Sequence, residues 1–343
     1  MTEDKFKIAA VQATPVFMNR DATVEKACLL IEEAAANGAR LVFFPEAFIP
    51  TYPDWIWFVP AGRIALNQKL YGALLDQAVA IPGETTERLC QAAREAGVFV
   101  SMGINERNDN ASGGTIYNTN ILINTEGDLI DRHQKLVPTV SERTIWAYGD
   151  PGTLAVHQTD IGKIGGLICH ENYMPLVRYS LYGRGIELYL APTYDESEMW
   201  QSTIRHIARE GRVYAAGCCM VLKKEAILER FSELAPFYEA AGEWINSGNS
   251  VIADPEGNIV AGPLSQAEGI LYADVDLEHV RSTRWNLDVA GHYSRPDAFQ
   301  LTVRTAPAPI LRVESGAGLP HEDALKEELF NEDGDSGQKS IFL

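Results

Sequence analysis

Three short segments of this sequence, each expected to lie where a strand ends, carry a glutamate, a lysine and a cysteine whose side chains could do chemistry. Glu46 follows the apolar run Leu-Val-Phe-Phe-Pro, Lys135 ends the segment Arg-His-Gln-Lys, and Cys169 ends the run Ile-Gly-Gly-Leu-Ile-Cys. A carboxylate can accept a proton, an ammonium group can stabilise negative charge, and a thiolate is a strong nucleophile. Each of the three is therefore a separate candidate for a catalytic role.

Each of the three also has an ordinary structural explanation. Glu46 could be a surface glutamate at a strand end, although burying an unpaired charge there would be costly. Lys135 could be a solvated lysine at the end of a charged strand. Cys169 could be a structural thiol in the core, the commonest environment of free cysteine. Against this, the polar His-Glu-Asn after Cys169 favours a site whose backbone N–H groups face a ligand.

Two other chemistries use the same cysteine. A papain-like pair of cysteine and histidine stays open, because the sequence alone does not eliminate the histidines that could serve; these are His133, His157, His170 and His206. A metal site would combine Cys169 and His170 with the adjacent Cys218 and Cys219. Neighbouring residues of a strand point to opposite faces and chelate one ion poorly, so no metal and no cofactor is expected.

Composition limits the class of protein. Of the 343 residues, 46% are hydrophobic and 22% charged, which is typical of a globular protein. The formal net charge of −18, with no basic run, argues against nucleic-acid binding. No apolar stretch approaches the roughly 20 residues that span a bilayer, and the start lacks a signal-peptide pattern. Five cysteines without a CxxC pair indicate a reducing compartment, so a cytoplasmic protein without a membrane partner is expected.

The elements that must position these residues alternate between strand and helix. Apolar runs predict strands, and apolar residues at steps of three and four predict helices. Strands are expected over 6–13, 41–44, 98–104, 115–124, 129–132, 154–158, 163–168, 186–191, 213–221, 250–253 and 258–260, and helices from about 24 to 35, 84 to 96, 175 to 183 and 198 to 210. This mixture predicts an α/β layered protein whose sheet has parallel and antiparallel parts.

Nothing in the chain separates two domains before its end. No linker rich in proline, glycine or serine interrupts the alternation, so a single domain over residues 1–300 is predicted, followed by a C-terminal extension over 301–343. From Val313 onward the extension holds eight acidic residues against two lysines and few large apolar ones. That composition predicts a mobile or partner-dependent tail, whose deletion over 313–343 should change assembly size more than chemistry.

Considered together, the segments resemble the nitrilase superfamily of carbon–nitrogen hydrolases. The resemblance runs from Lys7 to about Phe299, and Glu46, Lys135 and Cys169 match its Glu-Lys-Cys triad. The supporting motifs are Ala-Val-Gln, Phe-Pro-Glu, His-Gln-Lys-Leu-Val-Pro-Thr, Cys-His-Glu-Asn-Tyr-Met-Pro and Ala-Pro-Thr. The resemblance implies a four-layer αββα sandwich with mixed sheets. It also implies a homo-oligomer with a dimer as its building unit, which in some members extends into spirals or filaments.

Within that superfamily the details are similar to true nitrilases. These details are the Lys-Leu-Val-Pro-Thr segment with Glu142 three residues later, the Glu-Asn-Tyr-Met-Pro after the nucleophile, and Trp-Gln opening the next helix. The resemblance implies a small-molecule nitrile as substrate, Cys169 as nucleophile, and Glu142 as a fourth polar member that positions Lys135. One position departs: nitrilases usually carry tryptophan after the nucleophile, and this chain has His170. The departure puts pocket size and the ratio of acid to amide product in question.

The walls of the pocket are expected to be apolar and aromatic, as suits a neutral nitrile. The residues expected there are Tyr52, Thr139, Trp146, His170, Tyr173, Pro192 and Met199. Each could instead be ordinary core packing. Two rival functions remain at this point: an amidase or N-carbamoyl amino acid hydrolase on the same fold, and a non-catalytic binding or filament-forming member.

Overall fold

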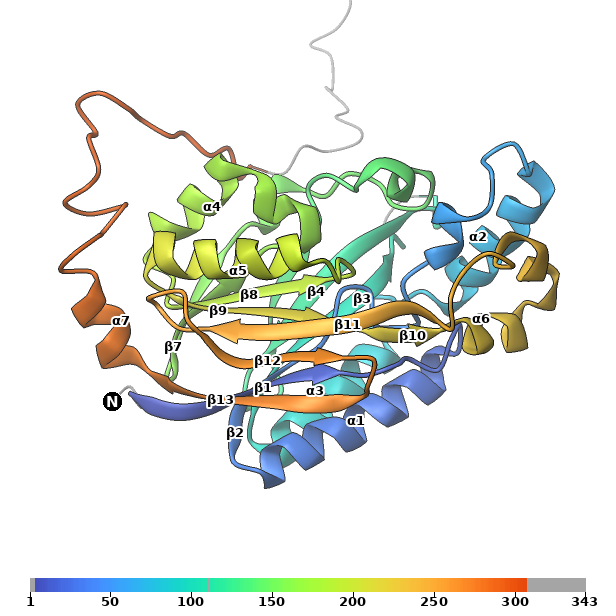
Figure 1. Cartoon of the computed structure of the whole chain (residues 1–343), viewed down its shortest axis with the longest axis horizontal. Coiled ribbons are helices and arrows are strands. Elements are labelled where there is room, and N and C mark those ends of the chain that lie inside the picture. Colours follow the sequence, from blue (N-terminus) through green and yellow to red (C-terminus); the bar gives the residue numbers. More distant parts are fainter. Residues whose placement is uncertain (1–3, 110–111, 307–343) are drawn as a thin grey trace, which may run out of the picture. The chain divides into compact units, whose positions relative to one another are not determined.

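Two mixed sheets lie between layers of helices in the computed structural model, which describes residues 4–109 and 112–306 (Figure 1). The first sheet has the strand order β13-β1-β2-β3-β4-β5, in which β1, β2 and β3 are parallel and the other pairs antiparallel. Its strands are β1 (Lys5–Gln12), β2 (Ala39–Phe43), β3 (Phe99–Arg107), β4 (Ile116–Ile123), β5 (Leu129–Gln134) and β13 (Gly269–Asp276).

The second sheet repeats this plan. Its order is β10-β11-β9-β8-β7-β6, with β12 paired to β11, and β7, β8 and β9 are parallel. Its strands are β6 (Val156–Thr159), β7 (Gly162–Gly166), β8 (Leu188–Thr193), β9 (Tyr214–Cys219), β10 (Val221–Lys223), β11 (Trp244–Ala253) and β12 (Ile259–Ser265). The expectation of a sheet structure with parallel and antiparallel parts is confirmed.

Helices cover the outer faces of the sheets. Helices α1 (Arg20–Ala36) and α3 (Glu84–Ala96) pack on the first sheet, and α4 (Pro175–Tyr182) and α5 (Glu198–Gly211) pack on the second. The layers therefore run helix, sheet, sheet, helix, so the predicted αββα sandwich is confirmed (Figure 1). The remaining α-helices of the described chain are α2 (Ile64–Gln77), α6 (Lys224–Arg230) and α7 (Leu277–Thr283).

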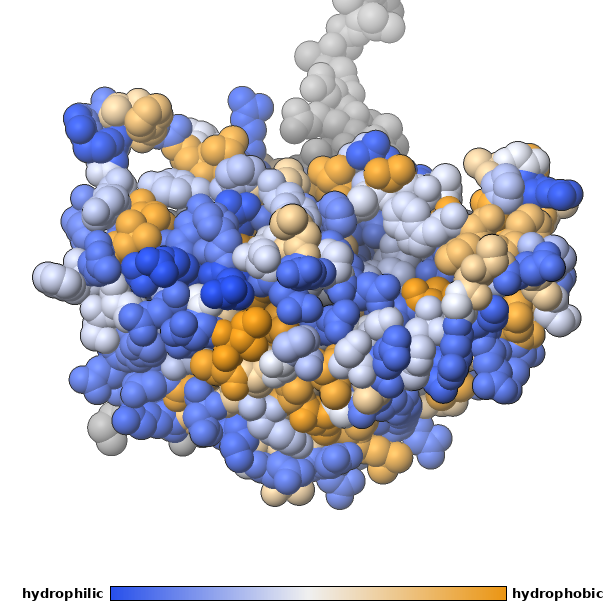
Figure 2. Space-filling view, viewed as in Figure 1, coloured by the Kyte–Doolittle hydropathy of each residue, from blue (hydrophilic) through white to orange (hydrophobic). Residues whose placement is uncertain are grey.

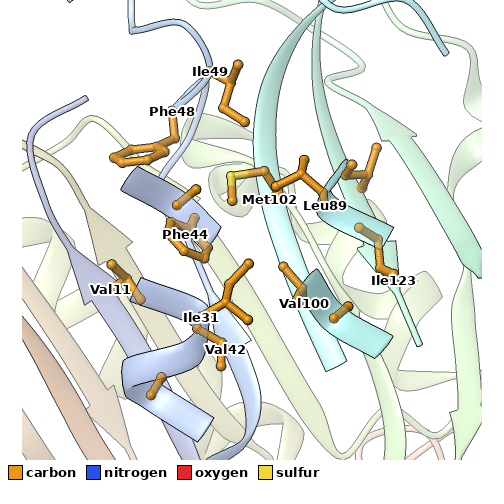
Figure 3. Packing of buried hydrophobic residues seen from close by; sticks show 14 of the residues in the cluster. Val11, Ile31, Val42, Phe44, Phe48, Ile49, Leu89, Val100, Met102 and Ile123 are labelled. Carbon is orange, nitrogen blue, oxygen red and sulfur yellow. The ribbon is translucent and has the colours of Figure 1, made fainter. Parts of the chain in front are cut away.

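Strand periodicity explains why the layers stack. Successive side chains of a strand point to opposite faces. On β1, Ile8 belongs to the core between the two sheets, whereas Val11 faces the helices and packs with Ile31 of α1 (Figure 3). Leu89 of α3 closes the same outer cluster. Because β1 is buried on both faces, it reads as a continuous apolar run rather than an alternating one.

Short 3₁₀ helices carry the polar motifs. They are η1 (Asp54–Trp57), η2 (Val140–Thr144), η3 (Pro151–Thr153), η4 (Cys169–Tyr173) and η5 (Ser232–Phe237). At one end of the sandwich, Tyr52, Trp55 and Trp146 form an aromatic core with residues of α2 and α6. This third core lies beside the ends of the strands from which the candidate residues project.

The sequence predictions differ from the structure in a few elements. The predicted helix over 84–96 matches α3, whereas α2, α6, α7 and β13 were not predicted. The predicted strand over 213–221 is two strands, β9 and β10, which are separated at Met220. β13 escaped prediction because its partner is β1, more than 250 residues away in sequence, and its own residues are mostly only half-buried.

The described residues all belong to one compact unit, which spans Met1–Pro307. The domain boundary at residue 300 stays a prediction, and the acidic tail over 313–343 lies outside the described residues. Within the described residues, none of the helices combines the length and the apolar character that a membrane crossing requires. On the face drawn in Figure 2, hydrophilic residues predominate and hydrophobic residues lie between them in separate groups.

Candidate active site

Glu46 lies three residues after β2 in a turn pressed against β3. Gly103 of β3 permits this approach, because a Cβ at that position would collide with the carbonyl oxygen of Pro45 and lie 2.6 Å from the backbone nitrogen of Ala47. The turn is held further by a hydrogen bond from the Ile49 N–H to the Gly103 carbonyl, 3.1 Å long. The carboxyl group is consequently buried, with no exposed surface.

Lys135 follows the last residue of β5, and its ammonium group meets two carboxylates. Its Nζ lies 2.6 Å from Oε1 of Glu46 and 2.7 Å from Oε2 of Glu142. Lys135 and Glu142 are each 1% exposed. The surface explanations of Glu46 and Lys135 are therefore wrong. A buried cation between two buried anions is an arrangement whose desolvation cost the ion pairs must offset.

Cys169 begins η4, three residues after β7 ends. Gly166 lets β7 pass close to β8, because a Cβ there would collide with the carbonyl oxygen of Leu190. Cys169 itself has φ of 51°, in the left-handed region that residues with a Cβ seldom adopt. Such backbone strain tends to accumulate at functional sites, where the surrounding structure maintains it.

Glu171 ties the cysteine turn to the lysine strand. Its Oε2 accepts a hydrogen bond from the Ile168 N–H at 2.8 Å, and its Oε1 accepts one from the Leu136 N–H at 2.6 Å. His133 of β5 pairs with the same carboxylate, with Nε2 3.0 Å from Oε2. One buried side chain therefore fixes the segment after β5, in one sheet, against the segment after β7, in the other.

The charged groups of the cluster shift the pKa values of both Glu46 and Cys169. Burial raises the pKa of Glu46 to about 7, and the Glu142 carboxylate adds to this rise. The Lys135 ammonium group and a hydrogen bond from Asn118 oppose it. A carboxyl group with a pKa near neutrality is suited to accept and return protons at physiological pH. Its second oxygen, Oε2, is buried and has no hydrogen-bond partner within the described structure.

The surroundings of Cys169 favour its neutral thiol form. Burial raises its pKa well above the usual range, the Glu46 carboxylate raises it further, and the Lys135 ammonium group lowers it. Burial alone would lower the pKa of Lys135, but Glu46, Cys169 and Glu142 raise it above the usual lysine value, so the ammonium group stays charged. Any nucleophilic use of the sulfur therefore requires a base to take its proton.

The histidines that a papain-like pair would use mostly have other partners. His133 is bound to Glu171, Nε2 of His157 lies 3.1 Å from Asp131, and Nε2 of His206 lies 3.5 Å from Glu210. Only His170 of the four candidates is in contact with the thiol, with Nδ1 3.4 Å from Sγ. Among the described residues, no group of three or more His, Cys, Asp or Glu side chains is arranged to hold a metal ion.

Three of the expected pocket residues lie around the lysine. The Tyr52 hydroxyl donates to Oε1 of Glu142 at 2.7 Å, and the Thr139 N–H donates to Oε2 of the same carboxylate at 2.6 Å. The Trp146 ring lies 5.8 Å from Nζ of Lys135. These residues support the charged cluster, and their contact with substrate stays a prediction.

The other expected pocket residues are divided between the surface and the core. His170 is exposed and packs edge-on against Tyr173, with ring centroids 5.1 Å apart. Tyr173 is 41% exposed and Met199, at the start of α5, is 69% exposed. Pro192 is buried in β8 and lines a small cavity between the sheets. A substrate role for these four also stays a prediction.

Sequence reasoning missed two residues that contact the candidate centre. Asn118 of β4 donates from Nδ2 to Oε1 of Glu46 at 2.7 Å. The Thr193 side chain, at the end of β8, hydrogen-bonds Cys169 and lowers its pKa. Asparagine is depleted in strands, so the polar Asn-Thr-Asn segment that begins at Asn118, between apolar residues of β4, was a signal that could have been used. Thr193 belongs to the Ala-Pro-Thr motif but carried no separate indication of its role.

A surface cleft of about 420 Å³ lies beside the cluster. Ser141 and Ile145, which flank Glu142 in the chain, line it together with Trp57. The Trp57 indole donates to the Tyr52 hydroxyl at 3.2 Å, and that hydroxyl donates to Glu142. The cleft is therefore joined to the buried charges through two hydrogen bonds.

Comparison with known protein families agrees with this geometry. Residues 7–285 match the model of the family described as carbon–nitrogen hydrolase. The chain belongs to the carbon–nitrogen hydrolase family. Since the match covers both sheets, it includes every candidate residue named above.

The sequences of several relatives align with most of the length of this carbon–nitrogen hydrolase. It is 42% identical over 310 residues to an aliphatic nitrilase of Sinorhizobium fredii, covering 88% of this chain and 97% of the relative. It is 38% identical over 311 residues to a bifunctional nitrilase/nitrile hydratase of Lupinus angustifolius, covering 88% and 86%. Among solved structures, Saccharomyces cerevisiae Nit3, a member of branch 10 of the nitrilase superfamily, aligns with a TM-score of 0.67 at 23% identity, covering 85% of this chain and 97% of that one. The last likeness concerns the fold alone.

Proposed function

We propose that this carbon–nitrogen hydrolase is a nitrilase, which converts an organic nitrile to a carboxylic acid and ammonia through a covalent intermediate on Cys169. One observation carries the proposal: a buried cluster of Glu46, Lys135 and Glu142 acts electrostatically on the Cys169 thiol, in a chain 42% identical to an aliphatic nitrilase.

Glu46 serves as the base in the first step. Its Oε2 is buried and has no hydrogen-bond partner among residues 4–109 and 112–306, so that oxygen is available to accept a proton. Its pKa, raised by burial to about 7, leaves a large fraction ionised at neutral pH. The thiol proton moves to this carboxylate, and the sulfur adds to the nitrile carbon. The carbon–nitrogen triple bond becomes a double bond, and the product is a thioimidate.

Lys135 stabilises the charge that develops on nitrogen. Its ammonium group is held by two carboxylates and stays protonated, so it can donate a hydrogen bond to the nitrogen during attack. The nitrogen then takes a proton supplied through Glu46 or Lys135, and the thioimidate carries one N–H. Glu142 holds Lys135 in place with Oε2, while the Tyr52 hydroxyl holds the other oxygen of Glu142.

Two molecules of water complete the reaction. The first, deprotonated by Glu46, adds to the thioimidate carbon to form a tetrahedral species. Protonation of its nitrogen lets ammonia leave and a thioester form. The second water adds in the same way, the C–S bond breaks, and the sulfur recovers a proton as the acid departs. If the C–S bond of the first tetrahedral species broke instead, the product would be the amide.

His170 is placed to influence that choice. Its Nδ1 is 3.4 Å from the sulfur, so it can donate a proton or hydrogen bond near the reacting carbon. A relative named as bifunctional nitrilase/nitrile hydratase indicates that both outcomes occur on similar chains. We assign His170 a share in setting the ratio of acid to amide.

A substrate panel tests the proposed function. Purified protein would be incubated with aliphatic, aromatic and arylaceto nitriles and with the matching amides and N-carbamoyl amino acids, and released ammonia measured. Ammonia from nitriles, abolished in Cys169→Ala, is expected. Ammonia from amides or carbamoyl compounds with none from nitriles would contradict the proposal and favour the amidase alternative. No product from any substrate would favour the non-catalytic alternative.

We further propose that the protein works as a homo-oligomer in the cytoplasm. Apolar side chains on two outer helices support an assembly through this surface: Leu176 and Tyr179 on α4 and Met199 on α5 are all exposed. All five cysteines are free thiols, as expected in a reducing compartment. Light scattering of the full chain should give a dimer or a multiple of it. A monomer at micromolar concentration, or an unaltered mass in Leu176→Glu, would contradict this surface.

A further inference from the structure

A second buried carboxyl group, Asp54, lies close to the candidate centre and has no role in the mechanism above. It begins η1, two residues after Tyr52, and is 1% exposed. In residues 4–109 and 112–306, no lysine, arginine or histidine forms an ion pair with it. Its Oδ1 accepts a hydrogen bond from the Tyr194 hydroxyl at 2.7 Å, and its Oδ2 accepts one from Tyr238 at 2.8 Å.

Such a group costs free energy of folding. An ionised carboxylate without a cation is unfavourable inside a protein, and hydrogen bonds recover only part of its lost hydration. Burial accordingly raises the pKa of Asp54 to about 6, while the two tyrosine hydroxyls oppose the rise and Glu196 adds to it. An apolar residue at this position would avoid that cost. The carboxyl group is therefore expected to hold a neighbouring group in place.

Tyr194 connects Asp54 to the catalytic cluster. Its ring is stacked on Tyr52, with centroids 3.8 Å apart and planes within 3° of parallel. Tyr52 also meets Trp146 edge-on, with ring centroids 5.4 Å apart. With its ring held by both neighbours, Tyr52 directs its hydroxyl at Glu142, whose other oxygen accepts from Lys135.

The same residue is also linked to the thiol. Tyr194 directly follows Thr193, whose side chain hydrogen-bonds Cys169. The Tyr194 carbonyl accepts a further hydrogen bond from Nδ2 of Asn246 at 2.7 Å. Displacement of the Tyr194 ring would therefore disturb the lysine side of the centre through Tyr52 and the cysteine side through Thr193.

We propose that Asp54 and Tyr194 are positioning residues: the carboxylate anchors the Tyr194 hydroxyl, and the stacked ring keeps Tyr52 aimed at Glu142 and hence Lys135 in place. This inference rests on the proposed catalytic role of Lys135. Neither residue touches the reacting atoms, so their effect is expected on turnover rather than on substrate affinity.

Tyr238 provides a matched control. It donates to the same carboxylate, but its ring stacks on Phe58 at 4.3 Å instead of on Tyr52. Tyr194→Phe and Tyr238→Phe each remove one hydrogen bond to Asp54 and should lower the melting temperature to a similar extent. Tyr194→Phe should reduce kcat about tenfold with KM little changed, because small misplacements of catalytic groups are costly. Tyr238→Phe should leave kcat within about twofold, since its ring contacts lie elsewhere.

A conservative variant of Asp54 tests the hydrogen bond that holds Tyr194. Asp54→Asn keeps an oxygen that can accept from Tyr194 and should retain most of kcat, whereas Asp54→Leu should lose as much as Tyr194→Phe. Equal kcat values for Tyr194→Phe and Tyr238→Phe, both folded, would overturn the inference. So would a loss in Tyr194→Phe that appears only in KM.

The rate of Cys169 alkylation by iodoacetamide, followed by peptide mapping, gives a readout independent of substrate. It should fall in Tyr194→Phe and stay at the wild-type rate in Tyr238→Phe; equal rates would count against the positioning role. If wild-type protein hydrolyses amides but not nitriles, the proposed function fails while this pair still tests the positioning role on the amide.

Discussion

Glu46, in the turn after β2, and Glu106, in β3, are two buried glutamates that each pair with a cation. Their carboxylate oxygens differ in how many hydrogen bonds they accept. Both oxygens of Glu106 are occupied: Arg132 contacts each, Gln134 donates to Oε1 at 3.0 Å, and Thr119 donates to Oε2 at 2.7 Å. Glu46 receives Asn118 and Lys135 on Oε1, and its Oε2 has no partner in the described structure.

The difference separates a structural ion pair from a candidate catalytic one. Full satisfaction of a buried carboxylate favours its charged form and contributes to stability. An unoccupied buried oxygen does the opposite, because it leaves a desolvated acceptor that a proton or substrate can occupy. Both glutamates are fully buried with a nearby cation, so burial and charge alone would not have distinguished them.

The largest expected effect is the loss of the base. Glu46→Gln keeps the shape of the side chain and removes its ability to take the Cys169 proton. We expect kcat to fall by about 10³-fold or more, as for loss of a general base in a covalent hydrolase. Steady-state ammonia release measures it. A variant that keeps a tenth of wild-type turnover would remove Glu46 from the mechanism.

Glu106→Gln is the matched control and should show the reverse pattern. Arg132 would lose its anionic partner but is partly exposed, so water can compensate in part. Unfolding in urea should show a loss of about 1–3 kcal/mol in the free energy of unfolding. The kcat of the folded protein should stay within about threefold, because the pair is separate from the centre. A kcat loss comparable with that of Glu46→Gln would break the distinction between the two sites.

The pH dependence of activity tests the role of the Glu46 carboxylate. Protonated Glu46 cannot accept a proton, so kcat/KM should fall as the pH drops below about 7, the value to which burial raises its pKa. The Glu142 carboxylate contributes to that rise. Glu142→Gln should therefore move the acidic limb to lower pH, whatever its effect on the maximal rate. An inflection that stays in place would indicate that another group titrates.

Asn118 and Asn120 allow a smaller perturbation of the same group. They lie on the same face of β4, but Asn118 donates to Glu46 whereas Asn120 pairs with Ser101. The Asn118 hydrogen bond lowers the pKa of Glu46, so Asn118→Ala should move the acidic limb to higher pH and reduce turnover at pH 7 about tenfold. Asn120→Ala should leave the limb unchanged. Equal profiles for the two variants would remove Asn118 from the centre.

The smallest expected effect concerns product choice. His170→Phe removes the ring nitrogen that lies 3.4 Å from the sulfur and keeps a ring beside Tyr173. The amide share of the product should rise, with total nitrile consumption changed by less than about tenfold. Chromatography of acid and amide measures the share, and Tyr173→Phe, which keeps the ring beside His170, should preserve the wild-type ratio. An unchanged share in His170→Phe would show that the imidazole does not influence the partition.

The sequence predicted the strands and helices of the main layers better than the elements at the end of the sandwich. Helix α3 and strands β1 and β2 carry clear apolar patterns and lie close to their predicted positions. Helix α2 carries Leu66, Leu70 and Leu74 at steps of four, a helical pattern that was overlooked, although only Leu70 and Leu74 are fully buried. Its burial depends on the aromatic core at the end of the sandwich, which is built from segments distant in sequence.

The candidate site shows the same limit. Glu46, Lys135 and Cys169 were predicted as a group through family resemblance, since 89 residues separate the first two and no local pattern joins them. The structure adds what motifs do not contain: an oxygen of Glu46 that has no hydrogen-bond partner in the described part of the chain, and the contacts made by Asn118 and Tyr194. Such contacts depend on how strands align across a sheet, which a single sequence does not specify.

The central chemical claim is a bond between the Cys169 sulfur and the carbon of a nitrile. Acid-quenched protein taken during turnover of an active nitrile, digested and analysed by mass spectrometry, tests it most directly. The account predicts a peptide containing Cys169 whose mass is increased by the thioimidate or the acyl group, and no such peptide from Cys169→Ala. Continued nitrile hydrolysis by Cys169→Ala, with the Cys169 peptide of the wild-type protein unmodified throughout turnover, would contradict it.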